Sequence, residues 1–220
     1  MISRRLFLTC TPALAWRARV PRDVAIWDLE KDCGLPESVR GFQAALKSVR
    51  VVQRFPGVAG ILIVPGVLTL RPSAIHQLQT FAARGGTVVL ETALAFGSPG
   101  NFAEQQRVLS REFGIDIDRP VDLWRPGWVG LPYIEYHRPV SVWVRDFGRA
   151  VPVVNAVRHP LASVQHRTVA ARYPFGHGEI NFLGSPLGPV LLSGDREGSQ
   201  WLEAFARGGH DEFLSYKITR

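Results

Sequence analysis

Short apolar runs alternate with amphipathic segments along the first half of the chain, and this alternation constrains the fold most strongly. The strand-sized runs are residues 24–28, 50–52, 60–64 and 87–90. Residues 61–64 are apolar at every position, as expected for a parallel strand covered on both faces. Apolar residues recur at helical spacing in segments 35–49, 72–83 and 101–113. Strands that alternate with helices in this way predict βαβ units and a mostly parallel sheet flanked by helices, an α/β fold.

The pattern changes after Gly114. Five further strand-like runs follow, at residues 134–136, 140–144, 151–154, 168–173 and 179–183. Glycines such as Gly148 and Gly176 lie between them and favour turns. We therefore expect an antiparallel β extension from about residue 115 to 183, followed by a helix over 193–207 with Trp201 and Phe205 facing inward.

The N-terminus has the pattern of an export signal. Arg4 and Arg5 form a twin-arginine pair before a short apolar stretch, and Ala13-Leu14-Ala15 has the small-x-small form of a cleavage site. The sequence predicts a Tat-type signal peptide over residues 1–15, a single domain over 16–220, and a periplasmic or secreted protein. An ordinary amphipathic N-terminal extension is the alternative. Cys10 lacks the small preceding residue expected of a lipidated cysteine.

Charge and cysteine content exclude several classes of protein. The formal net charge is +7, but the basic residues, 23 of the 26 being arginine, are spread along the chain rather than gathered in a run. Nucleic-acid binders concentrate such charge, so we expect no nucleic-acid partner. No apolar run of 18 residues exists, which predicts no membrane span. Two cysteines exclude a disulfide scaffold and a four-cysteine zinc site.

Three segments together resemble a known superfamily. They are residues 60–66 (GILIVPG), 81–93 (FAARGGTVVLETA) and 173–188 (YPFGHGEINFLGSPLG). In this combination the chain resembles the class I glutamine amidotransferase-like superfamily, and within it the non-catalytic or trehalose-utilisation-type branches. The resemblance implies a flavodoxin-like fold.

The same resemblance argues against amidotransferase chemistry. It places the nucleophile at Glu91 or Thr92, where the family has a cysteine, and a threonine with no evident base is a poor nucleophile. His177-Gly178-Glu179 has the His-x-Glu form of the family's base, but it lies in a glycine-flanked turn and is better explained as a hairpin. Cys33 is the other candidate nucleophile, and its alternative is a packed, unreactive thiol.

Polar residues at the predicted strand ends are the first candidate site. In an open α/β sheet, ligands bind beyond the carboxyl ends of the strands. Those ends carry Asp28, Glu30, Gly66, Glu91 and Ser185. Converging carboxylates could bind a hard cation, hydrogen-bond a sugar or act as an acid–base pair. The alternative is that they cap helices and accept backbone hydrogen bonds.

An aromatic cluster is the second candidate ligand site. It comprises Trp124, Trp128, Tyr133, Tyr136 and Trp143, interleaved with Arg125, Arg138 and Arg145. Exposed aromatics beside arginine suit sugar faces or a partner surface. The alternative is a β segment that buries its aromatics against the sheet.

No cofactor or metal motif is present. We find no phosphate-binding loop and no dinucleotide fingerprint, and the histidines lack ligand spacing. The sequence therefore predicts an exported, non-catalytic amidotransferase-like domain, without cofactor or metal, that binds a small polar ligand such as a carbohydrate, or a protein partner. Two alternatives stay open. One is a hydrolase using Asp28, Glu91 or Cys33, and the other is an assembly domain that forms a homo-oligomer.

Overall fold

A computed structural model describes residues 23–46, 49–57, 60–124, 132–145, 148–155 and 159–208. The expected signal peptide and Trp128 lie outside these residues, so the structure does not bear on them. Among the described residues, no helix is long and apolar enough to cross a membrane.

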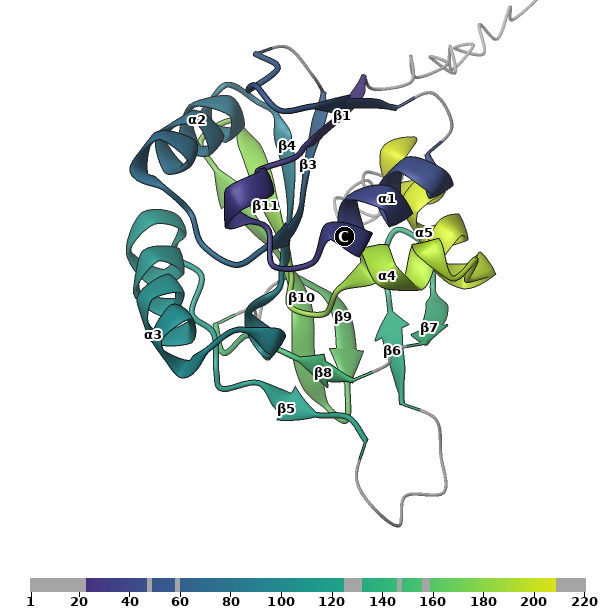
Figure 1. Cartoon of the computed structure of the whole chain (residues 1–220). Coiled ribbons are helices and arrows are strands. Elements are labelled where there is room, and N and C mark those ends of the chain that lie inside the picture. Colours follow the sequence, from purple (N-terminus) through teal and green to yellow (C-terminus); the bar gives the residue numbers. More distant parts are fainter. Residues whose placement is uncertain are drawn as a thin grey trace, which may run out of the picture.

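The described chain forms an α/β fold around a mixed sheet of nine strands in the order β2-β1-β3-β4-β11-β10-β9-β6-β7 (Figure 1). The first five strands in this order are parallel. They are β2 (Arg50–Val52), β1 (Val24–Trp27), β3 (Ile61–Val67), β4 (Thr87–Thr92) and β11 (Gly178–Leu183). The prediction of an α/β fold with a parallel sheet is therefore confirmed at this level.

The parallel strands are apolar at nearly every position because both of their faces are covered. In β3, Leu62 and Val64 join one hydrophobic core while Ile61 and Ile63 join a second core on the opposite face. Successive side chains of a strand point to opposite faces, so a strand buried on both sides needs a continuous apolar run.

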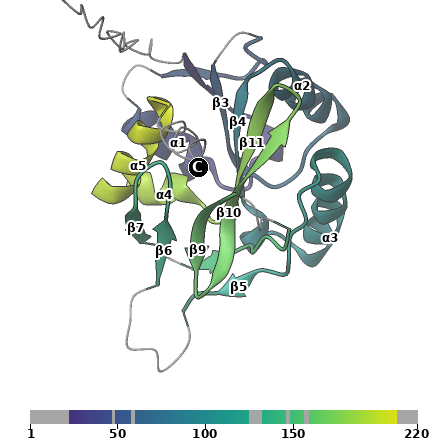
Figure 2. The same ribbon diagram turned by 180° about the vertical axis from the view of Figure 1, so that it is seen from behind.

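The other half of the sheet is antiparallel. It comprises β10 (Arg167–Phe175), β9 (Pro160–Val164), β6 (Tyr133–Tyr136) and β7 (Val142–Arg145), each antiparallel to its neighbours. Figure 2 shows β10 and β11 as a long hairpin in front of β4. A separate pair consists of β5 (Val121–Asp122) and β8 (Arg149–Ala150).

Two details of the predicted β extension are wrong. Residues 178–183 form β11, which pairs in parallel with β4 and so belongs to the parallel half. Residues 151–154 form no strand, and Val153 makes only an isolated bridge to Ile117. The local sequence pattern could not predict that β11 runs parallel to β4, because the direction of a strand is set by its neighbour rather than by its own residues.

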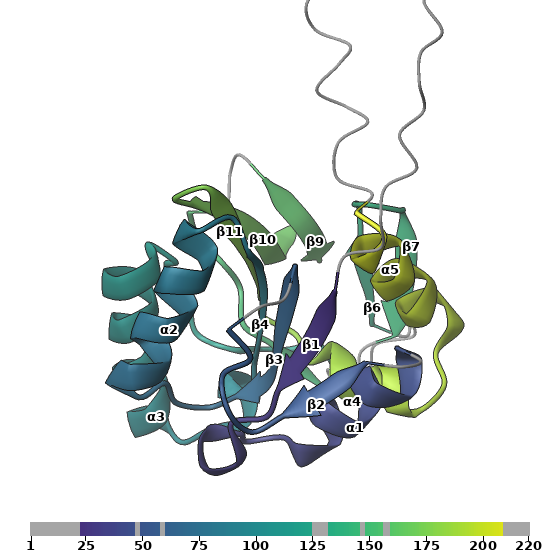
Figure 3. The same ribbon diagram turned by 90° about the horizontal axis from the view of Figure 1, so that it is seen from above.

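Helices cover both faces of the sheet (Figure 3). On one face lie α1 (Pro36–Ala45), α4 (Leu187–Leu192) and α5 (Arg196–Ala206). On the other lie α2 (Pro72–Ala83) and α3 (Pro99–Val108), and α3 continues into the π-helical turn η3 (Leu109–Phe113). Short 3-10 turns η1 (Glu30–Asp32) and η2 (Leu94–Phe96) follow β1 and β4. Proline at the first helical position and glycine after the end bound α2, as its sequence predicts.

Helix α5 covers the antiparallel half through aromatic contacts. The Trp201 ring lies 4.6 Å from the Tyr136 ring and 5.2 Å from the Phe205 ring, measured between centroids. Tyr136 is buried in this cluster. It is therefore core, and the predicted aromatic site loses one of its members.

Candidate functional site

Glu91 is the predicted strand-end carboxylate that the structure places most clearly. Its side chain is fully buried at the end of β4. One carboxylate oxygen accepts the Gly66 backbone N–H at 2.7 Å, and the other accepts the Gly188 N–H at 2.7 Å. Burial raises the pKa of Glu91, and the amides and the Ser38 hydroxyl around it only partly oppose this effect. Glu91 joins β3, β4 and the start of α4, and it does not line either of the pockets described below.

Thr92 and Ser185 are also buried. The Thr92 hydroxyl donates to the Val67 carbonyl at 3.2 Å and accepts the Leu94 N–H at 3.1 Å, so it connects β3 to η2. Ser185 lies in the turn between β11 and α4. Neither residue of the expected nucleophile position, Glu91 or Thr92, is available to a substrate.

Cys33 has the character of a packed thiol. It is half-buried, makes a backbone bridge to Val67, and lies beside Gly66. Burial raises the pKa of its thiol above 9.0, and the nearby carboxylates of Asp28 and Glu91 raise it further. A thiol with a raised pKa is a weak nucleophile at neutral pH, which favours the unreactive alternative.

Asp28 and Glu30 line a small polar pocket of about 280 Å³ after β1, together with Asp32 and Arg71. Their carboxylates are engaged within the fold. Asp28 accepts the Glu30 N–H at 2.9 Å, Glu30 accepts the Gln53 side-chain amide, and Asp32 forms an ion pair with Arg71 at 2.6 Å. Of these three carboxylates, that of Asp28 accepts a backbone amide, while those of Glu30 and Asp32 pair with side chains.

The predicted aromatic site separates into two groups. Tyr133 and Trp143 are exposed on β6 and β7, with ring centroids 6.4 Å apart, whereas Tyr136 is buried. Trp124 is exposed after β5. The exposure of Tyr133 and Trp143 leaves them available to a ligand, whereas the sequence could not tell the outward from the inward face of β6.

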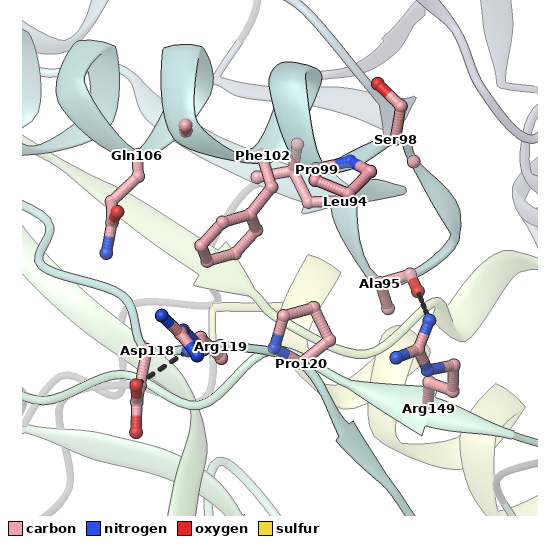
Figure 4. Close-up of a pocket in the computed structure, with 12 residues that line it drawn as sticks. Leu94, Ala95, Ser98, Pro99, Phe102, Gln106, Asp118, Arg119, Pro120 and Arg149 are labelled. Carbon is pink, nitrogen blue, oxygen red and sulfur yellow. Dashed lines mark hydrogen bonds between the residues drawn. The ribbon is translucent and has the colours of Figure 1, made fainter.

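A larger pocket, of about 830 Å³, lies beyond the carboxyl end of β4. One wall is formed by η2 and the first turns of α3, and the opposite wall by residues 118–120 and Arg149 (Figure 4). The half-buried Phe102 and the exposed Pro99 lie on the α3 side, facing Arg119 and Pro120. We call this space the α3 pocket.

Hydrogen bonds hold the two walls of the α3 pocket together at both ends, and Figure 4 draws the one between Arg149 and Ala95. At one end, the Gln106 side chain donates to the Ile117 carbonyl at 2.7 Å. At the other, the Arg149 guanidinium donates to the Ala95 carbonyl at 2.7 Å and forms an ion pair with Asp122 at 2.7 Å. Because both ends are joined, the space between the walls is preformed, which lowers the ordering cost of binding.

The lining of the α3 pocket combines apolar faces with charged groups. Phe102 and Pro120 offer apolar surface, and the exposed Arg119 forms no ion pair with another described residue. The Asp118 carboxylate accepts the Arg119 backbone N–H at 2.7 Å and keeps further acceptor capacity. This combination suits a small ligand with a C–H face and hydroxyl groups at its edge.

Sequence reasoning missed the α3 pocket. Phe102 lies in the segment 101–113, which was recognised only by its helical spacing, and Arg119 and Arg149 carried no motif. The pocket brings residues 94–106 against residues 118–120 and against Arg149, which lies 54 positions after Ala95, and no local spacing signals these contacts. Small-molecule sites span about 300–1,000 Å³. The volume of the α3 pocket lies within this range and that of the pocket at Asp28 lies below it, so the α3 pocket is the better candidate for a ligand site. Among the described residues, no group of three possible metal ligands gathers at either site.

The fold of this chain is similar to parts of several solved structures. No family model matches the chain, and no curated protein sequence matches it. The beta-galactosidase from Bacillus circulans sp. alkalophilus matches 87% of this chain with a TM-score of 0.60 at 19% identity, over 31% of its own length. The exo-beta-1,4-mannosidase from Opitutaceae bacterium strain TAV5 matches 84% with a TM-score of 0.56 at 17% identity, over 35% of its length. This chain thus spans about a third of these enzymes.

A third match is a shorter protein. The cytoplasmic protein STM1381 from Salmonella typhimurium LT2 matches 77% of this chain and 82% of its own, with a TM-score of 0.52 at 15% identity. At such identities the likeness shows a shared fold. The fold therefore occurs both as one part of glycoside hydrolases and as most of a separate chain.

These findings correct two predictions. Membership of the class I glutamine amidotransferase-like superfamily is contradicted, since no family model supports it and the similar enzymes are glycoside hydrolases. The predicted function, an exported amidotransferase-like binding domain, is wrong for the same reason. The segments that carried the resemblance contain strands β3, β4 and β11, which are neighbours in the parallel half of the sheet.

Proposed function

We propose that this chain is a carbohydrate-related domain of the glycoside-hydrolase kind, and that its α3 pocket binds a sugar. The observation that carries the proposal is the fold shared with one part of a beta-galactosidase and of a mannosidase, over more than four fifths of this chain. The lining of the α3 pocket supports it independently, because an aromatic ring beside hydrogen-bonding groups suits the two faces of a sugar.

We also infer a flavodoxin-like arrangement for the parallel half of the sheet. The strand order β2-β1-β3-β4-β11 corresponds to the order 2-1-3-4-5 of that fold. Ligands in such sheets bind outside the carboxyl ends of the strands. The α3 pocket begins directly after β4, so its position agrees with the rule.

The proposal assigns recognition of the sugar to this pocket. Glycoside hydrolysis uses two carboxyl groups that flank the scissile bond. Among the residues that line the pocket, Asp118 is the single carboxylate. A second carboxyl group would have to face the bound sugar for cleavage to occur there.

Titration with simple sugars tests the proposal. We expect methyl β-galactoside or methyl β-mannoside to shift the backbone NMR signals of residues around Phe102, Arg119 and Arg149. Phe102→Ala should weaken binding about tenfold, since it removes the aromatic face of the pocket. Phe96→Ala is the matched control, because Phe96 is 51% exposed in η2 and does not line the pocket.

Two results would contradict the proposal. The first is that neither sugar shifts any signal from the pocket at high concentration. The second is that Phe102→Ala and Phe96→Ala bind the sugar as tightly as the unmodified chain, which would place binding elsewhere.

A further inference from the structure

We propose that the outward face of the β6–β7 hairpin is a second carbohydrate surface that binds extended glycan chains. We call this face, formed by Tyr133, Glu135, Trp143 and Arg145, the aromatic platform. The inference rests on the proposed function for the chemical class of the ligand. It concerns a different surface of the molecule from the α3 pocket.

The antiparallel register places the two aromatic rings side by side. Tyr133 pairs with Arg145, and Glu135 pairs with Trp143. The two aromatics are thus diagonal neighbours on one face, within reach of each other. Their ring centroids are 6.4 Å apart with planes inclined by 42°. Trp143 is 61% exposed and Tyr133 is 43% exposed, so both rings offer a face to solvent.

The hairpin beneath the platform is rigidly held. Its inward residues Ile134, Tyr136, Val142 and Val144 are buried in the second core. Helix α5 also secures the edge strand, because Glu197 accepts the backbone N–H of Trp143. Two exposed aromatic rings on a preorganised strand pair bind a ligand without a large ordering cost.

Polar groups beside the rings suit the hydroxyls of a sugar. Glu135 lies directly across from Trp143 and is half exposed. His137 lies just after the end of β6, with one ring nitrogen 3.8 Å from the Glu135 carboxylate and the other 2.9 Å from the Ser163 hydroxyl. The rings can take the C–H faces of sugar units, while Glu135 accepts hydroxyl hydrogen bonds.

The size of the platform favours a glycan over a protein. A specific protein interface buries about 800 Å² per partner and involves about 20 residues. The platform offers two aromatic side chains with charged neighbours, which is too small an apolar area for a stable dimer. Two neighbouring exposed rings instead match a narrow, extended ligand.

The platform and the α3 pocket lie on different parts of the molecule. Figure 1 shows β6 and β7 on one side of the lower half and α3 on the other, with β8 and β9 between them. A glycan on the platform therefore does not need to occupy the pocket. The two surfaces can be tested separately, with polymers for the first and single sugars for the second.

Affinity electrophoresis of the full chain through gels containing soluble β-1,4-mannan, β-1,4-galactan or no polymer tests the platform. We expect at least one polymer to retard the chain, and Trp143→Ala to weaken the retardation at least about fivefold. Tyr133→Ala should have a smaller effect in the same direction. Leu192→Ala is the control, because Leu192 is an exposed apolar residue of α4 outside the platform.

Each outcome has a defined meaning. If neither polymer retards the chain, or if Trp143→Ala migrates as the unmodified chain does, glycan binding by the aromatic platform is contradicted. Sedimentation that shows a dimer dissociated by Trp143→Ala would also overturn it, in favour of a protein interface. Polymer retardation that depends on Trp143 supports the platform even if simple sugars fail to bind near Phe102, and that second failure would contradict only the α3 pocket.

Discussion

Glu91 shows how a single buried carboxyl group can organise the centre of this fold. Its two oxygens accept backbone N–H groups from the end of β3 and the start of α4. A carboxylate without partners would be very costly at this depth, but one that accepts two amides satisfies donors that would otherwise be orphaned. This structural role explains why a glutamate stands after a run of apolar residues in β4.

Replacing Glu91 with glutamine tests this role. Glutamine has one acceptor oxygen, so its NH₂ group would face one of the two N–H donors. We expect Glu91→Gln to lower the free energy of unfolding by about 1–3 kcal/mol. Urea unfolding measures the change. Glu203→Gln is the matched control, since Glu203 pairs with Arg207 on the exposed face of α5 and should cost no more than about 0.5 kcal/mol.

The same residue predicts a pH dependence. Burial raises the pKa of Glu91 above 4.5 in the folded chain, so the fold holds this proton more tightly than the unfolded chain does. The resulting stability is fully present below pH 4.5 and is lost as the pH rises through the raised value. The stability difference between the unmodified chain and Glu91→Gln should therefore shrink from pH 4.5 toward neutral pH. A difference that is constant over this range would contradict the raised pKa.

At the scale of elements, the crossing of α1 and α4 depends on two glycines. A Cβ atom on Gly41 would collide with the backbone of Gly188, and a Cβ on Gly188 would collide with the backbone of Ser38. The two helices therefore touch backbone to backbone. This contact positions the start of α4, whose amides reach Glu91.

Gly41→Ala tests the contact between the helices. Alanine favours a helix by about 1 kcal/mol over glycine, but here its methyl group would force α1 and α4 apart. We expect a net loss of about 1–3 kcal/mol and a lower Tm by circular dichroism. Gly100→Ala in α3 is the control, because the nearest atom to its Cβ would be 3.8 Å away, and it should be neutral or stabilising. Equal Tm values for both variants would contradict the close crossing.

Elements that leave a local sequence pattern could be predicted, whereas those set by contacts with distant segments could not. The strands at 24–27, 61–67 and 87–92 and the helix at 72–83 were recognisable, because burial on both faces or on one helical face leaves a local pattern. Helix α4 was not predicted: its six residues, Leu187–Leu192, are too few for a helical period and begin after a proline. The strand direction of β11 was equally invisible, since β4 determines it.

At the scale of the whole molecule, two surfaces on one α/β domain are the candidates for carbohydrate recognition. The α3 pocket is joined at both ends by Gln106 and Arg149, and the aromatic platform is supported by the core beneath β6 and β7. Because the fold is shared with part of two glycosidases, carbohydrates are the ligand class to test at both surfaces.

The export prediction also belongs to the whole molecule and remains to be tested. The twin-arginine pair Arg4 and Arg5 lies outside the described residues, and its test is cell fractionation. The double variant Arg4→Lys with Arg5→Lys should lose delivery across the membrane, because the Tat route depends on the pair. Arg17→Lys, just beyond the expected cleavage site, is the control. Unchanged delivery of the double variant would contradict a Tat signal.

The sequence by itself determined the fold class, because an apolar run or an amphipathic period is a property of neighbouring residues. It also identified Tyr133 and Trp143 as candidate aromatics, although not which face each would occupy. Only the tertiary structure decided that Glu91 is a structural carboxyl group and that Phe102 faces Pro120 across a pocket. These outcomes depend on contacts between segments far apart in the chain, and such contacts leave no spacing in the sequence to recognise.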